Sequence, residues 1–253
     1  MNSQRNVIYT RRRHALMGER IGLDVMNTLY DATVALVEQA RDGGDFDSFK
    51  LELFRTFALE CPVTEETFRE AKTDALTEQV FKAVMEQYKR RTERMAQVAD
   101  PVIRQVFENQ GAMYENIMIP VTDGKRMYNV SCNLKEAYDT HSRAIVKAFQ
   151  KAVTLLTIDE AWKEHLRDMD DLRQSVQNAS YENKDPLLIY KLEAYNLFKT
   201  MVETMNRKTV AILMRGQIPV QEEPNDERPS APRVRQAAPE RRTDMSRYRT
   251  EKD

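Results

Sequence analysis

The chain has 253 residues, 41% of them hydrophobic and 31% charged, with 39 basic against 40 acidic residues. This balance of charge argues against a general nucleic-acid binder, which is normally strongly basic. Two cysteines give no disulfide framework and indicate a reducing cytosol, and no apolar run approaches the roughly 20 residues that cross a membrane.

The scarcity of glycine and proline predicts an all-α fold of long helices. Residues 1–42 form the first predicted helix, because apolar residues recur at helical spacing from Val7 to Ala40. Gly18 and Gly22 each cost about 1 kcal/mol inside a helix, which indicates a kink or close packing there. No capping sequence precedes the pattern, so we expect the chain to begin partway along a longer helix.

Three further helices are predicted in residues 43–110. The sequence Asp-Gly-Gly-Asp at 42–45 ends the first helix, and an aromatic-rich helix follows at 46–59. Thr64 is predicted to cap a long polar helix that runs to about residue 99. An Asp-Pro pair at 100–101 then predicts the start of another helix, which ends near residue 109.

A small β-ribbon is predicted around residues 114–133. Two β-branched and aromatic stretches, 114–121 and 125–133, flank the turn sequence Thr-Asp-Gly-Lys at 122–125. An isolated hairpin is marginally stable in water, so we expect the ribbon to lie against helices.

A long antiparallel helical hairpin is predicted over residues 136–220, with its first arm starting near Leu134. A polar turn at 177–186 joins the arms, and Asp185 and Pro186 suit the cap and first position of the second arm. Arms of this length reach about 40–60 Å. Gly216 is predicted to stop the second arm, and residues 221–253, with four prolines, to form a disordered tail. The predicted packing seam of the hairpin comprises Trp162, Leu166, Met169, Leu172, Leu192 and Tyr195.

The sequence contains no motif for nucleotide binding or for metal ligation. The single Gly-Lys pair, at 124–125, lacks both the earlier glycine and the following hydroxyl residue of a P-loop. None of the histidines follows a Glu by three residues, as a bundle-type di-iron site requires. We therefore expect no catalytic residue and no metal, with His14, His141 and His165 as ordinary surface or interface residues.

Two features of the hairpin have alternative interpretations. The cluster at Glu160 and Glu164 resembles an acid–base pair, but at helical spacing it fits a solvated face with Lys163 and Arg167 better. Tyr181 is an aromatic residue in the polar turn, where burial is least expected. It either folds back on its own loop or is a contact point for a partner.

Three stretches carry a family resemblance: 1–11, 157–176 and 181–193. The second reads Thr-Ile-Asp-Glu-Ala-Trp-Lys-Glu-His-Leu-Arg-Asp-Met-Asp-Asp-Leu-Arg-Gln-Ser-Val. Together they resemble the scaffold helix and two-helix finger of the SecA family, the ATPase motors of bacterial preprotein export. The resemblance implies a helical scaffold domain at 1–42 and 136–220 and a helical wing domain at 43–135.

The resemblance also implies roles for particular residues and partners. Tyr181 would contact the translocating chain. The expected partners are a SecYEG-type membrane channel, unfolded preprotein, the motor's own nucleotide-binding domains and an anionic membrane surface, with no nucleic acid. ATP and magnesium belong to domains absent from this chain, which should not hydrolyse ATP alone. The location implied is cytoplasmic, peripheral at the inner face of the cytoplasmic membrane. The residues expected to bridge the two ATPase lobes are Asn2, Gln4, Arg5, Ile8, Tyr9 and Arg11.

The family's zinc-binding Cys/His segment is not carried over, because no such segment occurs up to Asp253. The alternative function is a stand-alone helical adaptor or coiled-coil structural protein. That alternative predicts a closed core, whereas the motor-fragment interpretation predicts an exposed apolar seam along residues 7–36.

Overall fold

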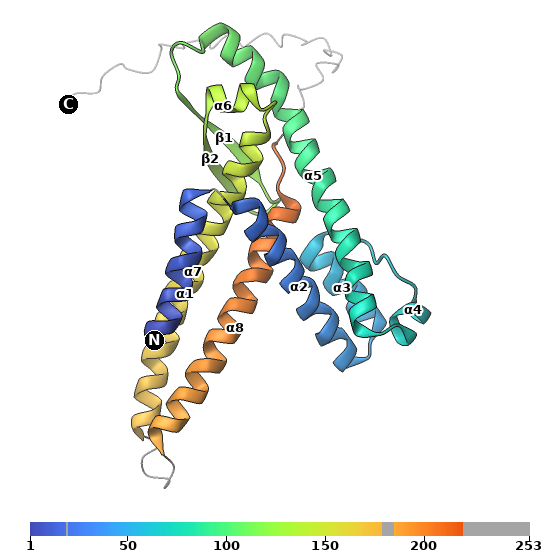
Figure 1. The fold of residues 1–253 in the computed structure, drawn as a ribbon, viewed down its shortest axis with the longest axis vertical. Helices are drawn as coiled ribbons and strands as arrows, with labels where there is room; N and C mark the ends of the chain where they lie inside the picture. The colour runs from blue at the N-terminus through green and yellow to red at the C-terminus, as the bar shows by residue number, and fades with distance from the viewer. Residues whose placement is uncertain (19, 179–184, 220–253) are drawn as a thin grey trace, which may run out of the picture. The chain divides into compact units, whose positions relative to one another are not determined.

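The computed structural model describes residues 1–18, 20–178 and 185–219. The predicted all-α fold with a small β-ribbon is confirmed (Figure 1). In chain order, the elements are α1 (Asn2–Met17), α2 (Ile21–Gly43), α3 (Phe46–Phe57), α4 (Glu65–Glu70), α5 (Thr73–Gln110), β1 (Asn116–Thr122), β2 (Met127–Asn133), α6 (Leu134–Asp139), α7 (Arg143–Asn178) and α8 (Pro186–Arg215). The predicted tail at 221–253 and most of the predicted turn at 177–186 lie outside the described residues.

The first predicted helix is two helices, α1 and α2, because Gly18 ends α1. Gly18 has φ 71°, and its N–H donates to the carbonyl of His14 at 2.9 Å. This left-handed conformation is the usual end of an α-helix and is easiest for glycine. The glycine that the sequence marked as a kink is thus a complete break, whereas Gly22 lies inside α2.

The end of α2 and the start of α3 follow the predicted signals. Gly44 has φ 67° and ends α2, and the Asp45 carboxylate accepts hydrogen bonds from the N–H groups of Asp47 and Ser48. Local chemistry alone is sufficient here, because a left-handed glycine and an N-cap aspartate suit these positions.

The long helix predicted from Thr64 is wrong in its extent. Thr64 does cap a helix, but that helix is the six-residue α4. The Arg41 guanidinium donates to the carbonyls of Phe68, Arg69 and Ala71, and Ala71 is extended with ψ 148°. Arg41 on α2 therefore occupies carbonyl groups that would otherwise accept the next helical hydrogen bonds if α4 continued.

The helix start predicted at Asp100–Pro101 is also wrong, because α5 runs through Pro101 without ending. Residues on both sides of the proline, Ala96, Ala99 and Ile103, are buried. Tertiary packing on both flanks thus overrides the local stop signal, as it often does for weak propensities.

The predicted ribbon is confirmed and packs against helices. Strands β1 and β2 pair antiparallel, with Ile119 opposite Val130. These two side chains point into the core, and the Tyr128 ring lies 6.2 Å from that of Phe149 on α7. Thr122 of β1 also forms one backbone bridge to Gln217, the second residue after the end of α8.

The hairpin is formed by α7 and α8. Its first arm begins at Arg143 rather than near Leu134, because α6 comes first and His141 and Ser142 have positive φ of 50° and 64°. The predicted start of the second arm is confirmed, since the Asp185 carboxylate accepts the Leu187 N–H at 2.9 Å and Pro186 takes the first position. The predicted stop at Gly216 is confirmed as well.

Two hydrophobic clusters hold these elements together. The larger joins α2, α3, α5, the ribbon, the start of α7 and the end of α8. The smaller cluster comprises Ile8 on α1, Ile158 on α7, and Met201 and Met205 on α8. The smaller cluster shows where α1 meets both arms of the hairpin.

Candidate functional site

Helix α1 lies along the hairpin and contacts both of its arms (Figure 1). Ile8 is 1% exposed and packs in the smaller cluster, with Trp162 and Phe198 half-buried beside it. Periodicity explains this placement: Gln4, Ile8 and Arg11 fall on one face of α1 at steps of four and three residues.

The Gln4 side chain bonds both arms. Its Nε2 donates to the carbonyl of Ala194 on α8 at 2.9 Å, and its Oε1 lies 3.4 Å from Nε2 of His165 on α7. Since a backbone carbonyl only accepts, the amide orientation is fixed. His165 therefore carries its proton on Nε2 and donates it to Gln4.

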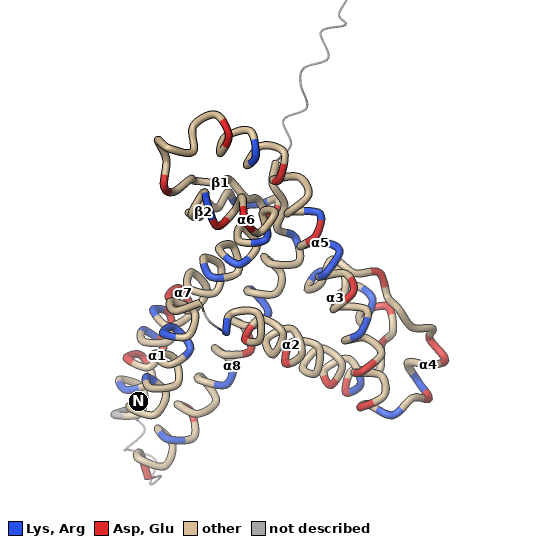
Figure 2. The backbone as a smooth tube through the Cα atoms, turned by 45° about the horizontal axis from the view of Figure 1, so that its top comes forward, with Lys and Arg blue, Asp and Glu red and all other residues tan. Residues whose placement is uncertain are grey.

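Two arginines on α1 add polar contacts nearer the base of the hairpin. Arg12 makes a two-pronged ion pair with Asp159 on α7, at 2.8 and 3.2 Å, and Arg11 donates to Oδ1 of Asn206 on α8 at 3.3 Å. Two residues before Asp159, the Thr157 hydroxyl on α7 bonds the Thr209 hydroxyl on α8 at 2.7 Å and so joins the arms directly. The described α1 sequence carries four arginines and no acidic residue, whereas α7 carries both signs, as Figure 2 shows.

His165 is an interface residue and not a surface residue, since its side chain is fully buried. Its ring lies 5.4 Å from that of Trp162 and 5.6 Å from that of Phe198. Burial lowers the pKa of His165 below its ordinary value, so the imidazole is neutral near pH 7. His165 is thus not part of the solvated face, where Glu164 and Arg167 form an exposed ion pair at 3.1 Å.

The predicted scaffold residues divide between two faces of α1. Gln4, Ile8 and Arg11 face the hairpin, as described above. Asn2, Arg5 and Tyr9 are exposed. The helix therefore has one face on the hairpin and a second face open to other contacts.

The predicted packing seam is formed only in part. Met169 is buried, and Trp162 and Leu172 are half-buried. By contrast, Leu166, Leu192 and Tyr195 are 38%, 57% and 66% exposed. The apolar stripe of each arm is wider than the contact between two helices. Near the tip no third helix from the described residues covers the rest of the stripe, because α1 extends only part of the way along the arms (Figure 1).

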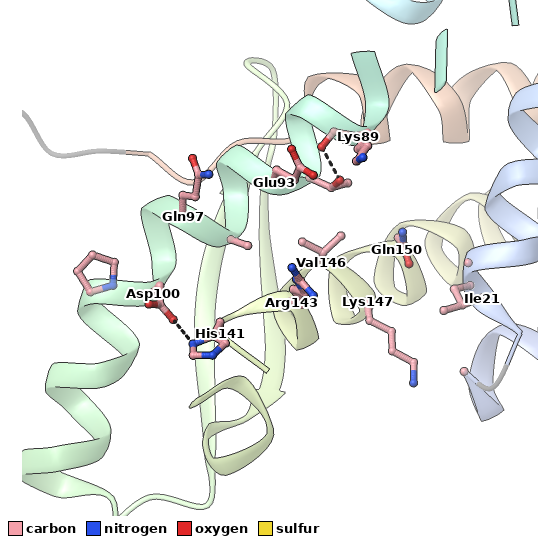
Figure 3. Close-up of a pocket in the computed structure, with 15 residues that line it drawn as sticks. Ile21, Lys89, Glu93, Gln97, Asp100, His141, Arg143, Val146, Lys147 and Gln150 are labelled. Atoms are coloured by element: carbon pink, nitrogen blue, oxygen red, sulfur yellow. Dashed lines mark hydrogen bonds and ion pairs between the residues drawn. The ribbon is translucent and has the colours of Figure 1, made fainter. Parts of the chain in front are cut away.

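A cleft of about 1040 Å³ lies between α5, the α6–α7 junction and the start of α2 (Figure 3). Lys89, Glu93 and Asp100 line it from α5 and Lys147 from α7, and His141 Nδ1 lies 4.0 Å from Asp100 Oδ1. Cations and anions are interspersed in this cleft, so it selects neither sign of ligand.

Among the described residues, no three or more His, Cys, Asp or Glu side chains are grouped as metal ligands would be. None of the helices in the described ranges is both long and apolar enough to cross a membrane. Tyr181, the predicted contact at the tip, lies outside the described residues.

Sequence reasoning missed Arg12, Asp159, Ala194, Asn206 and the role of His165. A signal for His165 was present, because it lies three residues after Trp162 and four before Met169 on the same helical stripe. The pair of Arg12 and Asp159 had no such signal, because opposite charges 147 positions apart are common in any charged chain.

These features define a class of helical scaffold in which one helix spans both arms of a long hairpin. The chain belongs to the SecA wing and scaffold domain family, whose model matches residues 1–217. It is 66% identical over 276 aligned positions to the protein translocase subunit SecA of Parabacteroides distasonis. This alignment covers all of this chain and 24% of that relative. It is also 60% identical to the protein of the same name from Porphyromonas gingivalis, in an alignment that covers all of this chain and 23% of the relative. The protein of that name from Flavobacterium psychrophilum is 45% identical, over 88% of this chain and 20% of the relative. The chain thus spans about a quarter of the length of these relatives.

Proposed function

We propose that this chain is the wing and scaffold portion of a SecA-type motor that drives ATP-dependent preprotein translocation. In this role it passes conformational changes of the motor's nucleotide-binding domains to the hairpin. The observation that carries the proposal is the seating of α1 on both arms. Arg12 and Gln4 bond α7, and Gln4 and Arg11 bond α8.

The outer face of α1 and α2 supports contact with further domains. The periodic apolar face of residues 7–36 is mostly buried, with Ile8, Val25 and Leu29 at most 2% exposed, so the predicted exposed seam does not form as such. Other apolar side chains along the two helices are exposed and leave surface for a partner. They are Val7, Tyr9, Leu16, Met17, Leu23, Met26 and Tyr30. The nucleotide-binding domains are the proposed occupants of this face, and they would supply ATP and magnesium.

The distal half of the hairpin supports contact with a translocating chain and a SecYEG-type channel. Leu188, Leu192 and Tyr195 are exposed at steps of four and three residues, so they form one apolar stripe on α8. Tyr181, at the tip, is the proposed contact with unfolded preprotein. A motor of this kind would act in the cytoplasm, held peripherally at an anionic membrane surface by its channel.

The test of coupling is a charge swap in the complete motor. Arg12→Glu places like charges together at Asp159, so the contact of α1 with α7 should weaken and the preprotein moved per ATP should fall by up to about fivefold. The double variant with Asp159→Arg restores the pair and should restore coupling. Arg167→Glu, beside Glu164 within α7, is the matched control and should have no effect. Normal transport per ATP in the Arg12→Glu variant would contradict the proposal.

The role of Tyr181 is tested separately by Tyr181→Ser in the complete motor. Loss of a central aromatic contact should lower the transport rate about tenfold, as measured by protease protection of a preprotein in vesicles. Tyr114→Ser, an exposed tyrosine outside the hairpin, is the control. Unchanged transport together with unchanged ATP turnover would remove Tyr181 from the mechanism.

A further inference from the structure

Gln4 differs from the other polar residues of α1 in the contacts that it makes. Arg12 bonds only α7 and Arg11 only α8, whereas the single amide of Gln4 reaches Ala194 on one arm and His165 on the other. Gln4 therefore ties the separation of the arms to the presence of α1.

The position of Gln4 along the hairpin makes this bridge significant. Near the base, the arms are joined without α1 by the buried hydroxyls of Thr157 and Thr209. Ala194 lies fifteen residues before Thr209 on α8, closer to the tip, and its small side chain lets α1 approach the helix backbone. Gln4 thus adds a polar bridge between the arms closer to the tip, beside the direct packing of His165 on Phe198.

The chemistry of the bridge admits few substitutes. Ala194 offers a carbonyl, which needs a donor, and the neutral His165 offers its Nε2–H, which needs an acceptor. A primary amide supplies both at the required spacing, whereas a carboxylate supplies only acceptors and a hydrocarbon neither.

We propose that Gln4 is a positioning residue that holds the two arms of the hairpin at one separation while α1 is seated. The stiffness of the hairpin then depends on where α1 lies. This inference rests on the proposed function for its consequence in the motor, but the clamp itself is a property of the chain.

The clamp is tested by measuring the distance between the arms in the full 253-residue chain. Spin labels are attached through ketone-bearing amino acids at Ser175 on α7 and Lys191 on α8, both exposed, so that the native cysteines stay in place. The wild-type chain should give one narrow distance by pulsed electron resonance. Gln4→Leu should replace it with a broader distribution that extends to longer distances. Asn6→Leu, an exposed amide on the same helix, should leave the narrow distance intact.

Gln4→Glu separates loss of the clamp from a general loss of structure. It has the same size as glutamine and retains an acceptor for His165, but it cannot donate to Ala194. Its distance distribution should therefore broaden as in Gln4→Leu while circular dichroism stays unchanged. Nitrogen NMR of His165 should show the Nε2–H form in the wild-type chain and a mixture of tautomers in Gln4→Leu.

The outcomes decide between a clamp and a merely structural contact. A lower melting temperature with the narrow distance retained in both Gln4 variants would overturn the proposal. Broadening in both variants supports it, whatever the complete motor does. If the arms spread but transport per ATP is normal in the complete motor, the clamp stands and the proposed coupling function fails.

Discussion

Replacing Gly216 by alanine is expected to lower the free energy of unfolding by about 2–3 kcal/mol. A Cβ atom at this position would lie 2.3 Å from Cε1 and 2.6 Å from Cζ of the buried Phe149 ring. Because that ring also packs against Tyr128 on the ribbon, it cannot move without disturbing β2. The φ of Gly216 is −54°, which alanine adopts freely, so the effect is steric alone.

The control for this prediction is Gly43→Ala, at the end of α2. A Cβ there meets nothing within 4 Å, and alanine restricts the unfolded chain more than glycine does, so stability should stay the same or rise by up to about 1 kcal/mol. Urea unfolding of both variants, followed by circular dichroism, provides the measurement. Equal midpoints for the two variants would show that Phe149 relaxes away from residue 216.

The parts of the fold that local chemistry determines could be predicted from the sequence. The start of α8 needed only the carboxylate of Asp185 and the fixed φ of Pro186. The β-ribbon needed only its turn sequence and two stretches of strand formers. Neither prediction needed a residue far along the chain, although the folded ribbon also packs against Phe149 and bridges to Gln217.

The elements that distant contacts determine could not be predicted. The end of α4 depends on Arg41, about thirty positions away, and the continuation of α5 through Pro101 depends on packing at Ala96 and Ile103. Both places carried a clear local signal that the tertiary structure overrides.

The candidate site shows the same division. Helical spacing alone puts Gln4, Ile8 and Arg11 on one face, and the structure shows that this face meets the hairpin. The partner atoms of that face, such as the Ala194 carbonyl, could not be predicted, because every residue of the second arm has the same backbone group. Which of these carbonyls is reached depends on how α1 seats in the folded chain.

The second large effect is expected for Arg41→Leu, which should lower stability by about 2–3 kcal/mol and unfold the segment around α4. The guanidinium donates to the carbonyls of Phe68 at 2.5 Å, Arg69 at 3.1 Å and Ala71, and its carbon lies 5.9 Å from the Phe68 ring centroid. Hydrogen bonds that involve a charged group contribute about 1.5–3 kcal/mol. Leucine has a similar helix propensity to arginine, so α2 itself should persist.

Hydrogen exchange at residues 64–72 tests this effect locally, because these amides should exchange much faster in Arg41→Leu while those of α5 stay protected. The matched control is Arg69→Leu, which removes an exposed ion pair between Arg69 and Glu65 whose side chains are 71% and 53% exposed. Its expected cost is below about 0.5 kcal/mol. If Arg41→Leu left the exchange at 64–72 unchanged, α4 would owe its end to its own sequence. The carbonyls of its last turn would then need no partner from α2.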